Sequence, residues 1–255
     1  MPSPQETPRC AVILCGGRGS RLRPLTDRVP KALAEVQGRP ILQHVLEALS
    51  AHGVSEFVLP AGWKAKAIRE RIPALRERVP GAYTLVESGV DTPIARRLGL
   101  LRPLLARHES FLLVNGDTLF DLDLDALHRQ HEETGSVVTL ASVELTSRFG
   151  LIFERSGRVV DFQRRTRIDG MRASDAFAPV ARINAGIAWV RSSVFEHFDP
   201  GTCDDFEAEL YPRLARRGLL GHLHLRGLWH CIDTLQDLEA AQALELPCAL
   251  PGAAA

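Results

Sequence analysis

The sequence of 255 residues lacks an excess of charge of either sign, and it lacks long apolar runs. Its 31 Lys and Arg residues balance 31 Asp and Glu residues, which gives no global electrostatic reason to expect binding to nucleic acid or to an anionic membrane. No apolar run approaches the roughly 18 residues that span a bilayer, and the first residues lack the basic patch and apolar core of a signal peptide. We therefore expect a cytoplasmic protein that binds neither nucleic acid nor a membrane.

Paired cysteines are also missing. The cysteines are odd in number and form no CxxC motif, which favours reduced thiols over a disulfide framework: Cys10, Cys15, Cys203, Cys231 and Cys248. Cys15 and Cys231 lie within apolar runs, and we interpret them as small core residues. No carboxylate pattern accompanies His222, His224 and His230, so the sequence predicts no zinc site at these histidines.

Lysine is scarce, since 28 arginines stand against three lysines, Lys31, Lys64 and Lys66. Base composition of the gene can produce such a preference for arginine. A position that retains lysine in this chain is nevertheless a candidate for a functional role, because an ammonium group is a compact point charge that a planar guanidinium does not replace.

The apolar spacing alternates between strand and helix over the first half of the chain. Residues 10–15 (CAVILC) form a continuous apolar run, as expected for a strand buried on both faces. Further strands are predicted at 57–59, 83–86 and 111–114, and helices at 41–49, 64–72, 94–106 and 124–131. This order indicates an α/β fold with a Rossmann-like mixed, mainly parallel sheet flanked by helices.

The pattern changes after Gly135, where short β segments predominate. Strands are predicted at 136–145, 151–153, 158–162, 183–190, 221–225 and 228–232, and helices at 205–216 and 235–244. Ser156-Gly157 is a predicted hairpin turn. There is no internal repeat and no linker, so we expect one domain over residues 10–246 whose second half adds a small β-rich lobe. The tails, 1–9 and 247–255, are expected to be flexible.

A glycine-rich segment follows the first predicted strand. It reads LCGGRGSRLRPLT over residues 14–26 and continues to Pro30-Lys31. Glycines let the backbone approach a ligand closely, and successive backbone N–H groups in such a turn bind anions. Arg21 and Lys31 add positive charge, so the segment predicts a polyphosphate cradle. An ordinary tight turn with solvated arginines is the alternative, which the extended spacing through Lys31 disfavours.

Two common phosphate-binding motifs are excluded. A dinucleotide-binding GxGxxG pattern read from Gly17 would need glycine at position 22, which is Leu22. A P-loop would need GK[ST] after the glycines, and none follows. A nicotinamide-dependent oxidoreductase is therefore a remote alternative.

The string GGRGSRLRPLT…PKAL resembles the signature of the sugar-phosphate nucleotidyltransferases. Further segments resemble that family in order, so that the resemblance covers roughly residues 10–245: PIL at 40–42, GWK at 62–64, NGD at 115–117, FG at 149–150, INAG at 183–186 and WHCIDT at 229–234. The WHCIDTL ending and VDT at 90–92 look most like the glucose-1-phosphate cytidylyltransferases.

The resemblance implies an enzyme that transfers a nucleoside monophosphate from a nucleoside triphosphate to a sugar 1-phosphate or a similar phosphorylated acceptor, releasing pyrophosphate. The product would be an activated nucleotide sugar. A phosphate monoester is already an anion near pH 7, so this transfer needs positioning and charge neutralisation more than a general base. The alternative is a non-catalytic homologue that binds a nucleotide sugar and regulates a partner. The sequence leaves a homo-oligomer open.

The resemblance also implies roles by position. Residues 10–135 become the nucleotide-binding half, with these nucleotide-binding residues: Leu14, Gly16, Gly17, Gly19, Ser20, Arg21 and Gly116. Arg21 would grip the triphosphate, Lys31 would neutralise the reacting phosphates, and Asp117 would complete the catalytic set. Asp117 and Asp233 would hold Mg²⁺, a hard cation that prefers carboxylate and phosphate oxygens. Taken singly, these two aspartates could instead be a turn residue and a helix cap.

Residues 136–246 become the acceptor-binding half, whose acceptor-binding residues would be Gly150, Arg164, Arg165 and Asn184. Where the family has Phe-x-Glu-Lys-Pro, this chain has FQRRT at 162–166, so Arg164 replaces a carboxylate that would touch sugar hydroxyls. This reversal predicts an acceptor other than a plain hexose 1-phosphate; the alternative is that Arg164 turns outward to solvent and the segment 168–182 is a surface loop. A second departure, Ala95-Arg96 where the family has a glycine pair, leaves the base of the nucleotide open.

Overall fold

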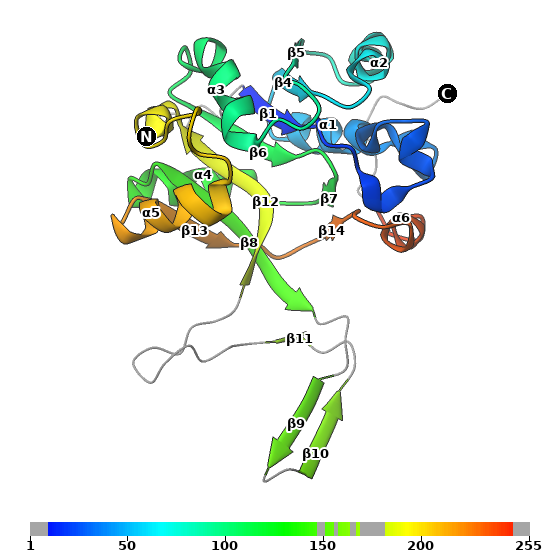
Figure 1. Ribbon diagram of the computed structural model, residues 1–255, viewed down its shortest axis with the longest axis vertical. Coiled ribbons are helices and arrows are strands. Elements are labelled where there is room, and N and C mark those ends of the chain that lie inside the picture. Colours follow the sequence, from blue (N-terminus) through cyan, green and yellow to red (C-terminus); the bar gives the residue numbers. More distant parts are fainter. Residues whose placement is uncertain (1–9, 147–150, 156–157, 164–166, 169–181, 247–255) are drawn as a thin grey trace, which may run out of the picture.

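The computed structural model describes residues 10–146, 151–155, 158–163, 167–168 and 182–246 (Figure 1). Its strands are β1 (Cys10–Leu14), β2 (Glu35–Val36), β3 (Arg39–Pro40), β4 (Glu56–Ala61), β5 (Ala82–Glu87), β6 (Ser110–Asn115), β7 (Thr118–Phe120), β8 (Val138–Thr146), β9 (Leu151–Arg155), β10 (Arg158–Gln163), β11 (Arg167–Ile168), β12 (Arg182–Arg191), β13 (Leu220–His224) and β14 (Trp229–Cys231). Its helices are α1 (Ile41–Ala51), α2 (Ala65–Arg78), α3 (Ile94–Leu105), α4 (Leu124–Thr134), α5 (Tyr211–Arg216) and α6 (Leu235–Ala241). Short helical turns are η1 (Ser20–Leu22), η2 (Leu25–Asp27), η3 (Lys31–Leu33), η4 (Ser192–Glu196) and η5 (Phe206–Leu210). Each predicted strand and helix has a counterpart in this set.

An eight-stranded sheet forms the centre of the fold. Its order is β11-β8-β12-β6-β1-β4-β5, and β13 also pairs with β8. The neighbours β6, β1, β4 and β5 are parallel, whereas β12 runs antiparallel to both β6 and β8. The chain places β4 and β5 on one side of β1 and then returns to place β6 on the other side. Such a reversal of strand order leaves a crevice at the carboxyl ends of the strands, where α/β proteins bind ligands.

Alternate residues of β1 pack on opposite faces of the sheet. Ala11 and Ile13 belong to a core that includes residues of α1, α2 and α4, whereas Cys10 and Val12 belong to a core with α3 and α5. All four side chains are fully buried, which confirms the prediction of a strand covered on both faces. None of the described helices is long and apolar enough to cross a membrane.

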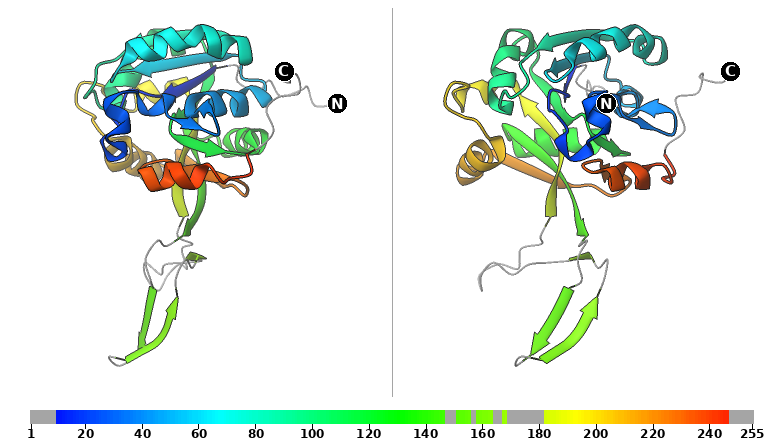
Figure 2. Two further views of the ribbon diagram at one scale, coloured as in Figure 1. Left: turned by 90° about the vertical axis from the view of Figure 1, so that its right-hand side faces the viewer. Right: turned by 45° about the vertical axis from the view of Figure 1, so that its right-hand side comes forward.

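The second half of the chain divides between the central sheet and a separate hairpin. Strands β8, β12 and β13 extend the sheet, so most of the expected β-rich region is continuous with the first half. Strands β9 and β10 form an antiparallel hairpin that projects away from the other elements beyond β8 and β12, as all views show (Figures 1 and 2). The predicted turn at 156–157 and both predicted tails lie outside the described residues.

Two of the α-helices, α4 and α6, begin with side-chain caps. Asp123 precedes α4 and accepts a hydrogen bond of 2.8 Å from the backbone N–H of Ala126. Thr234 precedes α6 and forms a reciprocal capping box with Asp237. Since Thr234 is the capping residue, the interpretation of Asp233 as a helix cap is wrong.

His131 on α4 is a buried titratable group in the core. Its side chain is fully buried, and its Nδ1 lies 2.8 Å from the hydroxyl of Thr139. Its Nε2 has no hydrogen-bond partner among the described residues. Burial, followed by the charges of Arg191 and His128, lowers the pKa of His131 from 6.5 to about 3. The folded protein therefore holds this imidazole in its neutral form.

We predict that His131 makes the protein less stable as the pH falls below 6.5. The unfolded chain takes up a proton near pH 6.5 and the folded chain only near pH 3, so each pH unit below 6.5 favours unfolding. By pH 5 the loss amounts to about 2 kcal/mol. Urea denaturation at pH 7 and pH 5 measures the free energy of unfolding. Between these two pH values, that free energy should fall by about 2 kcal/mol less in His131→Leu than in the wild type. His52→Leu serves as the control, and an equal loss in all three proteins would contradict the assignment.

Candidate active site

The candidate site lies at the carboxyl ends of β1 and β6, where the strand order reverses. Leu14 pairs with Asn115 in register, and the backbone N–H of Gly116 donates to the carbonyl of Leu14 at 3.0 Å. A Cβ atom on Gly116 would come 2.7 Å from that carbonyl oxygen, so this close passage of the two chains requires glycine. The carboxyl ends of these two strands therefore lie side by side at the site.

One ammonium group joins two carboxylates at this edge. Lys31 Nζ lies 2.7 Å from Asp117 Oδ2 and 2.9 Å from Asp233 Oδ1, and the Lys31 side chain is 14% exposed. Arg21 Nη1 lies 3.2 Å from Asp233 Oδ2. Burial by itself lowers the pKa of Lys31, but the charges and hydrogen bonds of the two carboxylates outweigh it, and the pKa is raised. Lys31 is therefore a fixed positive charge.

Backbone pairing brings the two carboxylates together. Asp117 follows β6 and precedes β7, and β7 pairs with β14, which ends just before Asp233. The N–H of Ile232 donates to the carbonyl of Asp117 at 3.0 Å, so the two acidic residues lie on adjacent chains. Of the three lysines, only Lys31 reaches this cluster. Lys64 lies over the ring of Trp63, and Lys66 is exposed beside Glu70.

The glycine-rich loop surrounds the Lys31 cluster. The resulting cavity has a volume of about 220 Å³ and is lined by Leu14, Cys15, Gly17, Gly19, Ser20, Arg21, Lys31, Ala32, Gly116, Asp117 and Asp233. Gly19 has φ +61°, and its carbonyl accepts a hydrogen bond of 2.9 Å from Thr26. A Cβ atom on Gly17 would meet nothing within 4 Å. The cavity therefore combines an open backbone surface with positive charge, as a polyphosphate cradle requires.

Gly16 has a different constraint, because the buried guanidinium of Arg97 lies directly beneath it. A Cβ atom on Gly16 would overlap Arg97. Arg97 is 5% exposed and donates to the carbonyls of Thr92 at 2.8 Å, Val90 at 2.9 Å and Gly16 at 3.4 Å, and also to the hydroxyl of Ser88. Burial lowers the pKa of Arg97. This arginine, which the sequence analysis missed, joins the glycine-rich loop to residues 88–92.

A larger cavity of about 760 Å³ continues from the glycine-rich loop toward α3 and η5. Gly16 and Asn184 line it, together with a group of acidic residues, Asp204, Asp205 and Glu207. The amide of Asn184 donates to Glu207 Oε1 at 2.7 Å, and its carbonyl oxygen accepts from the N–H of Gly186 at 3.0 Å. This end of the cavity presents carboxylate oxygens, which accept hydrogen bonds from hydroxyl groups.

An exposed ion pair between Arg18 and Asp91 also lines the larger cavity. Arg18 Nε and Nη2 donate to the two oxygens of Asp91 at 2.9 and 2.8 Å. The hydrogen bond from Arg18 lowers the pKa of Asp91. Ala95 and Arg96 stand where the family has a glycine pair, and neither of them lines the cavity. Ala95 is buried in the core, and Arg96 is exposed and pairs with Asp204 at 3.3 Å.

The structure brings together most of the residues predicted from the sequence. The predicted nucleotide-binding, catalytic and metal-binding residues line one or both cavities, as does Asn184. Gly150, Arg164 and Arg165 lie outside the described residues. The interpretation of Cys231 as a core residue needs correction, because this thiol is only partly buried and its sulfur lies within 4.8 Å of carboxylate oxygens of Asp117 and Asp233.

The carboxylates of Asp117 and Asp233 are suited to a hard divalent cation. Both oxygens that face Lys31 belong to groups only partly exposed to solvent, and an ammonium group already occupies the space between them. A cation is therefore favoured at this point, and carboxylate oxygens are the ligands that Mg²⁺ prefers. The donor set is compatible with the magnesium ion expected from the sequence.

Comparison with known proteins gives one family. A model of the nucleotidyl transferase family matches residues 10–243. The chain is 32% identical to glucose-1-phosphate cytidylyltransferase of Salmonella typhimurium and 30% identical to probable glucose-1-phosphate cytidylyltransferase of Bacillus subtilis, each over 89% of this chain and 92% of the relative. It is also 29% identical to mannose-1-phosphate guanyltransferase of Gibberella zeae, over 92% of this chain and 64% of that protein.

Solved structures share the fold. A putative glucose-1-phosphate thymidylyltransferase from Bacillus anthracis superposes with a TM-score of 0.69 at 18% identity, over 92% of this chain and 94% of that one. HddC from Yersinia pseudotuberculosis, complexed with GMP-PN, superposes with a TM-score of 0.67 at 20% identity, over 92% of this chain and 98% of that one. These likenesses confirm the mixed, mainly parallel Rossmann-like sheet.

We predict that Arg97 holds the glycine-rich loop in place. Arg97→Gln should cost at least about 2 kcal/mol of unfolding free energy, because the carbonyls of Gly16, Val90 and Thr92 would lose a buried donor. Amide hydrogen exchange of residues 15–20 and 88–92 should also accelerate. Arg96→Gln is the matched control, since an exposed ion pair contributes about 0–1 kcal/mol. Equal effects of the two substitutions would show that Arg97 has no special role.

Proposed function

Because the chain belongs to the nucleotidyl transferase family, we propose that it transfers a nucleoside monophosphate from a nucleoside triphosphate to a sugar 1-phosphate, releasing pyrophosphate and forming a nucleotide sugar. The observation that carries this proposal is the smaller cavity, where the glycine-rich loop meets Lys31, Arg21 and two carboxylates. Such a cavity offers charge neutralisation and positioning, which are the main requirements of nucleotidyl transfer.

The roles follow from the positions of the charged groups. The acceptor phosphate attacks the α-phosphorus, the bond to the β-phosphate oxygen breaks, and pyrophosphate leaves with the electron pair. Arg21, which is 70% exposed beside Asp233, is free to turn onto the triphosphate and stabilise the leaving pyrophosphate. Lys31 lies deeper, where its ammonium neutralises charge on the reacting phosphates. No proton has to be removed from the attacking phosphate, so no general base is needed.

We propose that Asp117 and Asp233 hold Mg²⁺ when the triphosphate binds. The ion would add positive charge beside the phosphate oxygens. In the free protein the two carboxylates are balanced by Lys31, at 2.7 and 2.9 Å, together with Arg21, at 3.2 Å from Asp233. Lys31 thus keeps two like charges close together before any substrate arrives, and it becomes available to the phosphates once the carboxylates have another partner.

We propose cytosine as the base, because the relatives identical at 30–32% are named glucose-1-phosphate cytidylyltransferases. For the acceptor, two features favour different groups. The carboxylate of Glu207 beside Asn184 favours sugar hydroxyls, whereas Arg164 in the sequence favours an anionic or carbonyl group. A sugar 1-phosphate that carries a carboxylate satisfies both. The cytoplasm is the proposed compartment, with free thiols at Cys10, Cys15, Cys203 and Cys231.

A screen for pyrophosphate release tests the proposed function. It combines CTP, GTP, UTP, ATP and dTTP with glucose 1-phosphate, mannose 1-phosphate and acidic, heptose, cyclitol and phosphonate acceptors. We expect CTP with an acidic sugar 1-phosphate to give the highest rate, above that of CTP with glucose 1-phosphate. Asp117→Asn and Asp233→Asn should each lose about a hundredfold or more in kcat while the fold persists. A protein that binds nucleotide sugars but releases no pyrophosphate with any pair would instead be the non-catalytic homologue.

We predict that Lys31 and Arg21 contribute to different steps. Lys31→Ala should lower kcat by about a hundredfold, because the lost charge acts on the reacting phosphates. Arg21→Ala should mainly raise the KM of the triphosphate, since the exposed guanidinium contributes to binding. Arg23→Ala is the control, as Arg23 lies on the same loop but pairs with Asp27 at 3.2 Å. If Lys31→Ala changes only KM, its assignment to the chemical step is wrong.

A further inference from the structure

A second cluster of chemically reactive side chains lies at the opposite edge of the sheet. Cys10 is the first residue of β1, Glu56 is the first residue of β4, and the two are paired in register. His108 lies in the connection between α3 and β6. Three separate segments of the chain therefore meet at the amino-terminal ends of the central strands, remote from the cavities around Lys31.

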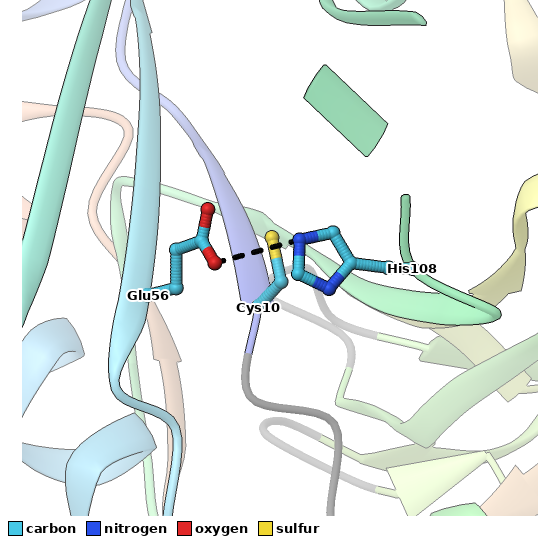
Figure 3. Close-up of side chains that lie close together, drawn as sticks. All are labelled: Cys10, Glu56 and His108. Carbon is cyan, nitrogen blue, oxygen red and sulfur yellow. Dashed lines mark ion pairs between the residues drawn. The ribbon is translucent and has the colours of Figure 1, made fainter. Parts of the chain in front are cut away.

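The donor atoms of these three residues converge. The sulfur of Cys10, a carboxylate oxygen of Glu56 and a ring nitrogen of His108 all lie within 4.8 Å of one another (Figure 3). His108 Nε2 is 3.5 Å from Glu56 Oε2, and the side chains of these two residues are only 19% and 18% exposed. Cys10 is fully buried. A thiol, an imidazole and a carboxylate at this spacing form a set of three metal ligands.

A cationic side chain covers the cluster. Arg107 pairs with Glu56 Oε1, and its Nε donates a hydrogen bond of 3.2 Å to His108 Nε2. His108 Nε2 is thus a lone-pair acceptor in this arrangement, as it would be toward a metal ion. Arg107 is itself 56% exposed, so it can turn into solvent with little loss of packing. The guanidinium neutralises Glu56 in the absence of another cation.

We propose that Cys10, Glu56 and His108 bind one divalent transition-metal ion of the zinc class. Thiolate and imidazole ligands favour zinc over magnesium or calcium, which prefer oxygen ligands. On binding, the sulfur–metal bond forms, the thiol proton passes to solvent, and Arg107 leaves Glu56 and His108. The ion would tie β1 and β4 to the segment before β6. It is remote from the nucleotide cavity and would stabilise the fold rather than take part in transfer.

Cobalt(II) is the probe for the thiolate ligand. Cys231 also lies near carboxylates, so the measurement is made on the metal-free Cys231→Ser protein. We expect one equivalent of Co²⁺ to produce a thiolate-to-cobalt charge-transfer band. Adding Cys10→Ser should abolish the band, whereas adding Cys203→Ser, which removes another buried thiol, should leave it unchanged. Absence of the band in the Cys231→Ser protein, or its survival after Cys10→Ser, would overturn the proposal.

Zinc affinity, measured by competition with a chromophoric chelator, gives a second and independent test in the same Cys231→Ser background. His108→Ala should weaken Zn²⁺ binding about tenfold or more. Arg107→Gln should tighten it, because the competing guanidinium is gone; a cluster held together only by hydrogen bonds predicts no such gain. Zn²⁺ should also raise the Tm of this protein but not that of the variant with Cys10→Ser added. Equal Tm shifts in both would indicate adventitious binding. None of these readouts depends on nucleotidyl transfer.

Discussion

The ammonium group of Lys31 between Asp117 and Asp233 is the interaction on which the candidate site depends. Asp117 lies 86 positions after Lys31 in the sequence, and Asp233 lies 202 positions after it. Without a cation, two carboxylates held on adjacent chains would repel each other. The pairing of β7 with β14 brings the two acidic residues close together, and the positive charge of Lys31 offsets the repulsion between their carboxylates. Fold and site are thus stabilised by the same contacts.

At the amino-terminal ends of the strands, too, a carboxylate is neutralised by a basic side chain. There Glu56 is mostly buried and is neutralised by the exposed side chain of Arg107. In both places carboxylates are paired with a basic side chain, Lys31 at Asp117 and Asp233 and Arg107 at Glu56. Strand β1 connects the two edges directly, since it begins at Cys10 and ends at Leu14 in the cavity.

The sequence predicted what depends on neighbouring residues and missed what depends on distant ones. The first strand, the glycine-rich loop and the strand-end aspartates were predictable, because each is a local pattern or follows one. Arg97 was not, since a single arginine in an amphipathic helix resembles any solvated charge, while its partner Gly16 lies 81 positions away. Cys231 looked like a core residue because its neighbours are apolar. Its strand pairs only with β7, in a two-stranded sheet, which leaves the thiol partly exposed beside the carboxylates.

The structure also shows how one peptide group of the glycine-rich loop, between Gly16 and Gly17, is oriented. The carbonyl of Gly16 accepts hydrogen bonds from Arg97 at 3.4 Å and from the N–H of Trp63 at 3.1 Å, so it points into the protein. A trans peptide group is planar with its C=O and N–H in opposite directions, and the N–H of Gly17 therefore points away from Arg97. A Cβ atom on Gly17 would meet nothing within 4 Å, and Gly17 lines the cavity. Arg97 and Trp63 thus fix the orientation of the peptide group that joins Gly16 to Gly17.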